Sequence, residues 1–308
     1  MQPITEAGDL KGKRVLVRVD WNVPFKDGKP LNNFRIKASL PTLEFLNNAG
    51  AKVTIATHLE TGDIELLKQF VPAGMELLPN LRENPGEESN SEEFAKELAS
   101  KADVFVNEAF SVSHREHASI VGVPKYLPHY AGLEFMKEVE SLSKAFNPPH
   151  PFLIILGGAK VETKLPLIQK FLDIADEIFI AGAMAKTASE MPFATNAKIS
   201  FPLGDIAALD ADEANLELLK KKIASAQFII WNGPLGKYEA GFKEGTIKLA
   251  QMLSENGSRV IVGGGDTLAV IEELNILNKF LFVSTAGGAM LDFLATGTLP
   301  GIEALSKK

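Results

Sequence analysis

The chain has 308 residues, of which 45% are hydrophobic and 23% are charged, and it carries a formal net charge of −7 at pH 7. This length favours about two domains of ordinary globular composition. The negative balance argues against a sequence-independent nucleic-acid binder, because such a protein needs a basic face to neutralise phosphates. The absence of cysteine excludes disulfides, thiol nucleophiles and thiolate metal sites.

The N-terminal residues lack the apolar core of a signal peptide. No apolar run in the chain approaches the roughly 20 residues that a membrane-spanning helix needs. We therefore expect a cytoplasmic protein without membrane or nucleic-acid partners.

The first half of the chain alternates buried strands with amphipathic helices. Strands rich in β-branched residues are expected at 13–19, 52–57 and 103–107, with a weak strand at 75–78. Helices are expected over 35–48, 91–101 and 131–146, with a short one near 64–70. The run Asn147-Pro-Pro-His-Pro151 ends the last of these helices, so we place a domain boundary there.

The second half repeats strand and helix five times. The strands are expected at 152–156, 177–181, 227–231, 259–262 and 280–283, and the helices at 160–172, 183–190, 240–255, 266–274 and 287–295. Helices of this length between strands imply right-handed crossovers and a parallel sheet. The sequence therefore predicts an α/β fold.

The stretch 152–164 opens the second half. Its five leading apolar residues predict a strand buried on both faces, and Gly157 and Gly158 then let the backbone turn sharply. We expect a helix to start directly after the glycines, which would put Lys160 and Lys164 on one face of its first turn. Lysines oppose the dipole at a helix N-terminus, so they indicate either a site that gathers negative charge or ordinary surface positions.

Polar side chains gather where the strands of the first half end, which is the edge where open parallel sheets bind ligands. Those at strand ends are Asp20, Asn22, His58, Asn107, His114 and Arg115, with Arg35 and Arg82 in nearby connections. Several arginines and a histidine at one edge would bind a phosphate or carboxylate through charge-assisted hydrogen bonds. Each arginine taken alone also fits a solvated surface position.

All five strands of the second half run into glycine-containing turns before a helix. The turns are 157–160, 181–184, 231–236, 263–267 and 285–289. We interpret them as bare backbone against a bulky ligand, and helix N-termini at this edge favour a polyphosphate. Asp266, which follows three glycines, either caps a helix or holds Mg²⁺ on phosphate oxygens, and it can do both.

Other phosphate-binding and catalytic motifs are absent. The chain contains no P-loop, no Gly-x-Gly-x-x-Gly after a strand, no zinc-type histidine cluster and no nucleophile elbow. One anion site and one nucleotide-like site instead indicate phosphoryl transfer, which needs alignment, neutralised oxygens and exclusion of water. An acceptor that is already a carboxylate requires no general base.

Six segments, in order from end to end, resemble phosphoglycerate kinase. They are 14–24, 107–117, 156–164, 231–236, 263–267 and 299–305. The resemblance implies an α/β fold of two Rossmann-like three-layer domains with parallel sheets, joined by a hinge helix. It implies a 3-phosphoglycerate-binding domain at 1–147, on which the C-terminal tail 296–308 packs back, and a nucleotide-binding domain at 148–295.

The resemblance also implies reversible Mg²⁺-dependent transfer between ATP and 3-phosphoglycerate, giving ADP and 1,3-bisphosphoglycerate. Transfer would be in line, in a cleft closed by hinge bending, in a monomeric glycolytic enzyme. Positions matching the family's substrate-binding residues are Asp20, Asn22, Arg35, His58, Arg82 and Arg115. Positions matching its nucleotide-binding residues are Gly158, Lys160, Lys164, Gly182, Asn232, Pro234, Glu239, Gly263, Gly264, Gly265, Asp266 and Thr267, with Asp266 as the metal ligand. Positions matching its catalytic residues are Arg35, Lys160, Lys164 and Gly264.

The chain departs from the family's pattern in three places. His58 is followed by Leu-Glu-Thr-Gly where the family usually has Leu-Gly-Arg-Pro, so one substrate arginine is missing and a glutamate stands close by. The connection from there to Arg82 is shorter than usual. The region between Met184 and Trp231 is also shorter, and the segment 205–210 resembles the remnant of a nucleotide loop.

Three functions follow from these observations. The first is an active phosphoglycerate kinase, and the second is a catalytically weak homologue retained for nucleotide or partner binding. A third, an acyl-phosphate kinase for a different small acid, is favoured only by the missing arginine. The presence together of Arg35, Lys160, Lys164 and Asp266 favours an active enzyme.

Overall fold

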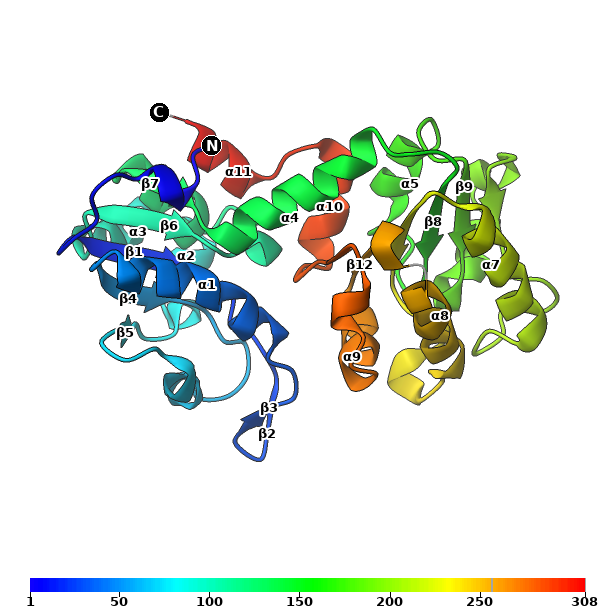
Figure 1. Ribbon diagram of the computed structural model, residues 1–308, viewed down its shortest axis with the longest axis horizontal. Coiled ribbons are helices and arrows are strands. Elements are labelled where there is room, and N and C mark those ends of the chain that lie inside the picture. Colours follow the sequence, from blue (N-terminus) through cyan, green and yellow to red (C-terminus); the bar gives the residue numbers. More distant parts are fainter. Residues whose placement is uncertain (256, 308) are drawn as a thin grey trace. The chain divides into compact units, whose positions relative to one another are not determined.

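The computed structural model describes residues 1–255 and 257–307, and the chain divides into two compact units. Unit 1 comprises Met1–Glu140 and Thr298–Lys308, and unit 2 comprises Ser141–Gly297. Each unit is a parallel sheet with helices (Figure 1), so the predicted α/β fold is confirmed. Within the described residues, no helix is both long enough and apolar enough to cross a membrane.

The sheet of unit 1 has five parallel strands in the order β5-β4-β1-β6-β7. Their bounds are β1 (Arg14–Arg18), β4 (Lys52–Ala56), β5 (Glu76–Leu77), β6 (Val104–Asn107) and β7 (His129–Ala131), and a small antiparallel pair comprises β2 (Phe25–Lys26) and β3 (Lys29–Pro30). In the centre, Val15 of β1 pairs with Val53 of β4 and with Val104 of β6. Strand β7 was not predicted; it ends at Ala131, where the helix 131–146 was expected to begin, and the helix itself begins at Leu133.

Three helices of unit 1 lie close to the predicted ranges 35–48, 91–101 and 131–146, and the two others, at 85–88 and 300–306, were not predicted. The helices of this unit are α1 (Phe34–Asn48), α2 (Pro85–Glu88), α3 (Glu92–Ser100), α4 (Leu133–Ser143, which continues into unit 2) and α11 (Pro300–Ser306). Ser91 caps α3 by accepting a hydrogen bond from the backbone N–H of Phe94. The C-terminal helix α11 lies beside the N-terminal residues (Figure 1), and together they line one cavity of this unit.

The sheet of unit 2 has six parallel strands in the order β10-β9-β8-β11-β12-β13. Their bounds are β8 (Phe152–Leu156), β9 (Glu177–Ile180), β10 (Ile199–Ser200), β11 (Phe228–Asn232), β12 (Val260–Gly263) and β13 (Phe282–Val283). All five residues of β8 are buried, as its unbroken apolar run predicts. The two central strands, β8 and β11, pair along their full length.

Each helix of unit 2 follows one of these strands along the chain. The helices are α5 (Leu165–Phe171), α6 (Ala185–Ser189), α7 (Glu213–Ser225), α8 (Glu244–Glu255), α9 (Gly265–Glu273) and α10 (Gly288–Thr296). Helix α7 was not predicted, although Asp212 caps it by accepting from the N–H of Asn215.

The helix after β8 begins later than the sequence analysis expected. It starts at Leu165, with Pro166 in its first turn, rather than directly after the glycines. A helix starting near residue 160 would place the proline ring against a carbonyl of the preceding turn and lose a hydrogen bond. A start at Leu165 puts the proline where the N–H would have no partner in any case. The expectation that Lys160 and Lys164 share one face of a helical turn is therefore wrong.

Candidate functional site

In unit 1 the predicted substrate residue Asp20, which follows β1, bonds to Arg35 and Ser111. Arg35 forms an ion pair with this carboxylate at 3.1 Å, and the Ser111 hydroxyl donates to it at 2.5 Å. Arg35 also donates to the backbone oxygen of Asn22 at 3.3 Å. Burial raises the pKa of Asp20. Arg35, His58 and the hydrogen bond from Ser111 together lower it by more, so the pKa of Asp20 lies below its ordinary value. Asp20 is therefore an ionised carboxylate that orients Arg35.

His58, at the end of β4, is only 2% exposed. Its Nδ1 lies 3.0 Å from Nη2 of Arg18. Burial, followed by the charge of Arg18, lowers the pKa of His58 to about 3, so the ring is neutral at pH 7. The guanidinium can only donate, so Nδ1 accepts and Nε2 carries the proton. Nε2 is buried and has no hydrogen-bond partner in the described part of the protein, which leaves a donor for a ligand.

Arg18 is fully buried and was missed by sequence reasoning. Its Nε donates to the Ser119 hydroxyl at 2.9 Å, and that hydroxyl donates to Glu87 at 2.5 Å. Glu87 is itself 0% exposed, so the hydroxyl links a buried cation to a buried anion. The only sequence signal was an arginine between Val17 and Val19, within the apolar run that begins at Val15.

Arg82 and Arg115 complete the basic cluster, and the charges of both act on His58. Arg82 stands beside the histidine because Leu81 donates its backbone N–H to the carbonyl of Thr57. Nη1 of Arg82 bonds Glu88 at 2.6 Å, whereas its Nε and Nη2 are buried without a hydrogen-bond partner in residues 1–255 and 257–307. Unit 1 thus gathers buried, unsatisfied donors of the kind that bind carboxylate or phosphate.

In unit 2 the central residue of the candidate site is Lys164, whose ammonium group lies against Gly158. Lys164 is buried, and a methyl group built on Gly158 would be 3.7 Å from its Nζ. Burial lowers the pKa of Lys164, and the nearby charge of Asp266 opposes this shift. Burial and then Glu239 raise the pKa of Asp266, while Lys164 lowers it. Three of the predicted nucleotide residues therefore act on one another electrostatically.

Lys160 differs from Lys164 in its surroundings. It is exposed, in the turn between β8 and α5, and its backbone carbonyl accepts from the Thr163 hydroxyl at 3.0 Å. Lys164 is therefore buried against the glycine turn, whereas Lys160 is exposed to solvent.

The predicted glycines fall into two groups. A methyl group on Gly182 would lie 2.7 Å from the backbone nitrogen of Gly158, and one on Gly157 would lie 2.0 Å from the carbonyl oxygen of Pro234. Gly263 is packed in the same way against the sulfur of Met290, 2.1 Å from such a methyl. At these positions the missing side chain is required by close approach between parts of the protein itself.

Gly264 and Gly265, at the start of α9, are not packed tightly against other parts of the protein. Gly264 has φ +105°, and a methyl group on Gly265 would meet nothing within 4 Å. Gly264, not Asp266, occupies the N-cap position of α9, so the expectation that Asp266 caps the helix is wrong. Asp266 lies in the first turn of α9 and is exposed.

The other predicted nucleotide residues are buried and hold the loops together. The Thr267 hydroxyl accepts from the N–H of Gly233 at 3.1 Å, and the carbonyl of Pro234 accepts from the N–H of Gly158 at 2.8 Å. Nδ2 of Asn232 faces the sulfur of Met290 at 3.9 Å.

Asp210 lies in the shortened region before α7, and its carboxylate bonds to neighbouring segments. It accepts hydrogen bonds from the N–H of Ala211 at 2.9 Å and of Gly245 at 3.1 Å. A side chain on Gly236 or Gly245 would collide with it, at 2.5 and 2.6 Å. Asp210 therefore ties this segment to the loop after β11 and to the start of α8.

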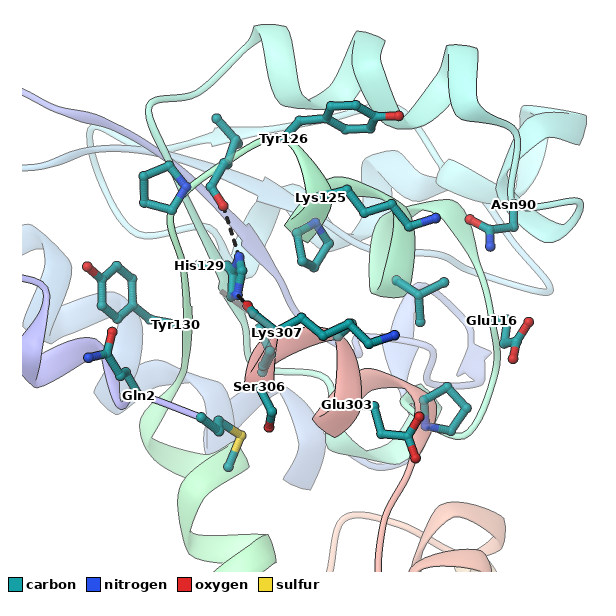
Figure 2. Close-up of a pocket in the computed structure, with 18 residues that line it drawn as sticks. Gln2, Asn90, Glu116, Lys125, Tyr126, His129, Tyr130, Glu303, Ser306 and Lys307 are labelled. Carbon is teal, nitrogen blue, oxygen red and sulfur yellow. Dashed lines mark hydrogen bonds between the residues drawn. The ribbon is translucent and has the colours of Figure 1, made fainter.

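A cavity of about 870 Å³ lies elsewhere in unit 1 (Figure 2), and none of the predicted site residues lines it. It lies between α11 and the segment 121–130, and the side chains of Lys125 and Lys307 extend along it (Figure 2). His129 has both ring nitrogens 2.9 Å from carbonyl oxygens, those of Leu127 and Lys307. This cavity is separate from the basic cluster.

Comparison with known proteins gives one consistent family. The family model for phosphoglycerate kinase matches residues 4–71, 61–199 and 188–297. The phosphoglycerate kinases of Fervidobacterium nodosum and Dictyoglomus turgidum are each 36% identical, over 97% of this chain and 97% of theirs. The structure of phosphoglycerate kinase from Coxiella burnetii has a TM-score of 0.82 at 32% identity, and that from Pyrococcus horikoshii 0.87 at 28%, each covering 99% of this chain and 98% of the other.

The relatives are longer than this chain although they match both of its ends. The alignment with the Fervidobacterium protein runs over 388 positions, whereas this chain has 308 residues, so residues of the relative are missing internally. The three matched segments meet at 61–71 and 188–199, inside the two connections that the sequence analysis found short. From these matches, the chain belongs to the phosphoglycerate kinase family.

Proposed function

We propose that this chain catalyses reversible phosphoryl transfer between ATP and 3-phosphoglycerate, giving ADP and 1,3-bisphosphoglycerate. One observation carries the proposal beyond family membership. Beside the Asp20–Arg35 ion pair, unit 1 keeps the buried donors of His58 and Arg82 without hydrogen-bond partners in the described residues. Unsatisfied buried donors are costly, so their presence indicates that an anionic ligand normally bonds to them.

In this proposal unit 1 holds the acid and unit 2 holds the nucleotide. Asp20, Asn22, Arg35, His58, Arg82 and Arg115 form the acid site. Lys164, Asp266, Glu239 and the open backbone at Gly264 and Gly265 form the core of the nucleotide site. A carboxylate oxygen of the acid forms a bond to the γ-phosphorus while the bond to the β-phosphate oxygen breaks, and no proton needs to move. Arg35 and Lys164 balance the charge of the phosphoryl oxygens.

Lys160 and Gly264 are proposed as further contacts to the transferred group. Lys160 is exposed and belongs to the same turn as Lys164, so its flexible side chain can reach a ligand that the buried lysine holds. Gly182, Gly263, Asn232, Pro234 and Thr267 are proposed to act mainly by holding the loops that surround the nucleotide, because their contacts are to neighbouring loops and helices.

The residues present fit a magnesium ion. The described residues contain no group of three His, Asp or Glu side chains that could hold a metal by themselves. Mg²⁺ in nucleotide sites usually needs only one or two carboxylates, because phosphate oxygens and water complete its coordination. Asp266, exposed at the start of α9, would hold it, and the ion would neutralise charge on the phosphate oxygens.

Transfer also requires the acid and the nucleotide to meet with water excluded, so we propose that hinge bending between the units accompanies the reaction. We further propose that the protein acts as a monomer in the cytoplasm. Small-angle scattering should give a smaller radius of gyration with both substrates than with either alone. An unchanged radius would contradict closure.

A second candidate, phosphorylation of a different small acid, is favoured by Glu60, which lies 3.8 Å from Arg82. A coupled assay of ADP release distinguishes the two, with 3-phosphoglycerate, glycerate and other carboxylic acids as acceptors. Turnover highest with 3-phosphoglycerate supports the proposed function. Turnover with another acid alone would reassign the substrate, and absence of turnover with every acid would leave the protein a homologue retained for binding.

A further inference from the structure

Arg82 presents two chemically different sides. Its Nη1 is bonded to Glu88 at 2.6 Å. Its Nε and Nη2 form the opposite fork of the guanidinium, and both atoms are buried without a hydrogen-bond partner in the described chain. Two parallel N–H groups of this kind match the two oxygens of a carboxylate or phosphate. The fork is thus the side of Arg82 that a ligand can use.

Glu60 approaches this fork. Its Oε1 lies 3.8 Å from Nη2, which is within ion-pair range but too long for a hydrogen bond. The Glu60 side chain is 51% exposed, so it keeps the freedom to move toward the arginine or away from it. Glu60 therefore places a negative charge beside donors that it does not satisfy.

The backbone holds Glu60 in this place. Its N–H donates to Oδ1 of Asn22 at 3.0 Å. Oδ1 of Asn80 accepts from the N–H of Leu59 at 3.0 Å, and Nδ2 of Asn80 donates to the Leu59 carbonyl at 2.8 Å. These bonds fix residues 59 and 60 next to the segment that carries Arg82. The proximity of residue 60 to Arg82 is thus built into the fold.

We propose that Glu60 is a specificity-determining residue that competes with the anionic group of the acid substrate for the Nε–Nη2 fork of Arg82. This inference rests on the proposed function, since it concerns the same acid site. A phosphate that binds the fork must displace the Glu60 carboxylate or lie beside it, and the like charges repel. The repulsion grows with ligand charge, so Glu60 weakens the binding of a phosphorylated acid more than that of an unphosphorylated one.

The test compares three single substitutions in the full chain. Glu60→Gln removes the charge at the fork, and Glu88→Gln removes a charge from the other side of the same arginine. Glu65→Gln removes a distant surface charge that pairs with Lys68. For each variant, kcat and KM are measured with 3-phosphoglycerate, and calorimetry gives the affinities for 3-phosphoglycerate and glycerate.

Glu60→Gln is expected to tighten 3-phosphoglycerate binding by about three- to tenfold, with a matching fall in KM and little change in kcat. Its effect on glycerate should be smaller, and Glu65→Gln should match the wild type. Equal affinities for wild type and Glu60→Gln would overturn the inference. So would equal gains from Glu60→Gln and Glu88→Gln, because that result reports net charge alone. An inactive wild type would overturn the proposed function, while the calorimetric comparison would still decide the role of Glu60.

Discussion

Nη2 of Arg18 lies 3.0 Å from Nδ1 of His58, and both side chains are almost fully buried. Because a guanidinium only donates, this contact fixes the proton of the neutral imidazole on Nε2, the nitrogen that lacks a protein partner. Arg18, on strand β1, therefore determines which ring nitrogen of His58 can donate a hydrogen bond to a ligand. A buried arginine in that position must itself be compensated, and Glu87 supplies the charge through Ser119.

This arrangement predicts a large stability effect for Glu87, a residue that is not among the proposed substrate contacts. Glu87→Gln should lower the free energy of unfolding by about 3 kcal/mol, because buried Arg18 would lose the larger of its two compensating charges and keep only that of Asp20. Urea denaturation followed by tryptophan fluorescence measures the change. Glu83→Gln, at an exposed position of the same region, is the control and should differ from the wild type by less than about 0.5 kcal/mol. A similarly small effect for Glu87→Gln would mean that the contacts of Arg18 with Ser119 and Glu87 do not stabilise the fold.

Lys164 is expected to be more important for turnover than Lys160. Lys164→Met should lower kcat by about 100-fold or more, because the variant removes a desolvated positive charge next to the glycine turn. Lys160→Met removes an exposed charge and should have a smaller effect on kcat. Steady-state kinetics, with circular dichroism to verify folding, provides the measurement. Near-normal turnover of the Lys164 variant would argue against its role.

The sequence predicts a strand or helix well where a local pattern of residues determines it, and poorly where contacts with distant residues do. Strand β8 is a continuous apolar run, so its position and burial follow directly from the sequence. Apolar spacing alone places the start of α5 too early, because Pro166 excludes a helix that begins near residue 160. Helix α7 was missed although Asp212 and an amphipathic pattern mark it.

The candidate site shows the same division. Residues at strand ends were found because parallel topology brings these ends to one edge. Arg18 could not be ranked as part of the site, since its partners Ser119 and Glu87 are distant in sequence and meet it only in the folded state. Gly157 and Gly182 are also required by neighbouring backbone, a packing constraint that no local pattern reveals.

Asp266 is expected to act through the metal and not through the nucleotide alone. Asp266→Asn should weaken the binding of Mg²⁺-ADP by about 10- to 100-fold and leave the binding of ADP in EDTA nearly unchanged or slightly improved. The improvement would come from removing a negative charge near the phosphates. Isothermal titration calorimetry under both conditions separates the two effects. Equal losses with and without the metal would show that Asp266 does not hold it.

Because Glu108 is buried, we expect the stability of unit 1 to depend on pH. Its buried carboxylate accepts hydrogen bonds from the Thr42 hydroxyl at 2.5 Å and from the N–H of Glu134 at 3.1 Å. Burial nevertheless raises the pKa of Glu108 from 4.5 to about 8. Between these two values the folded state holds a proton that the unfolded state has lost, so the free energy of unfolding should fall as pH rises from 4.5 to 8.

The matched variant is Glu108→Gln, which keeps the shape of the side chain but cannot ionise. Urea denaturation at a series of pH values should show a shallower decline for this variant than for the wild type, with the largest difference in slope between pH 5 and 8. The wild type should lose about 1 kcal/mol or more across this window, because each unit of pKa difference corresponds to 1.36 kcal/mol. Parallel curves for the two proteins would mean that Glu108 stays ionised in the folded state, held by its hydrogen bonds to Thr42 and the start of α4.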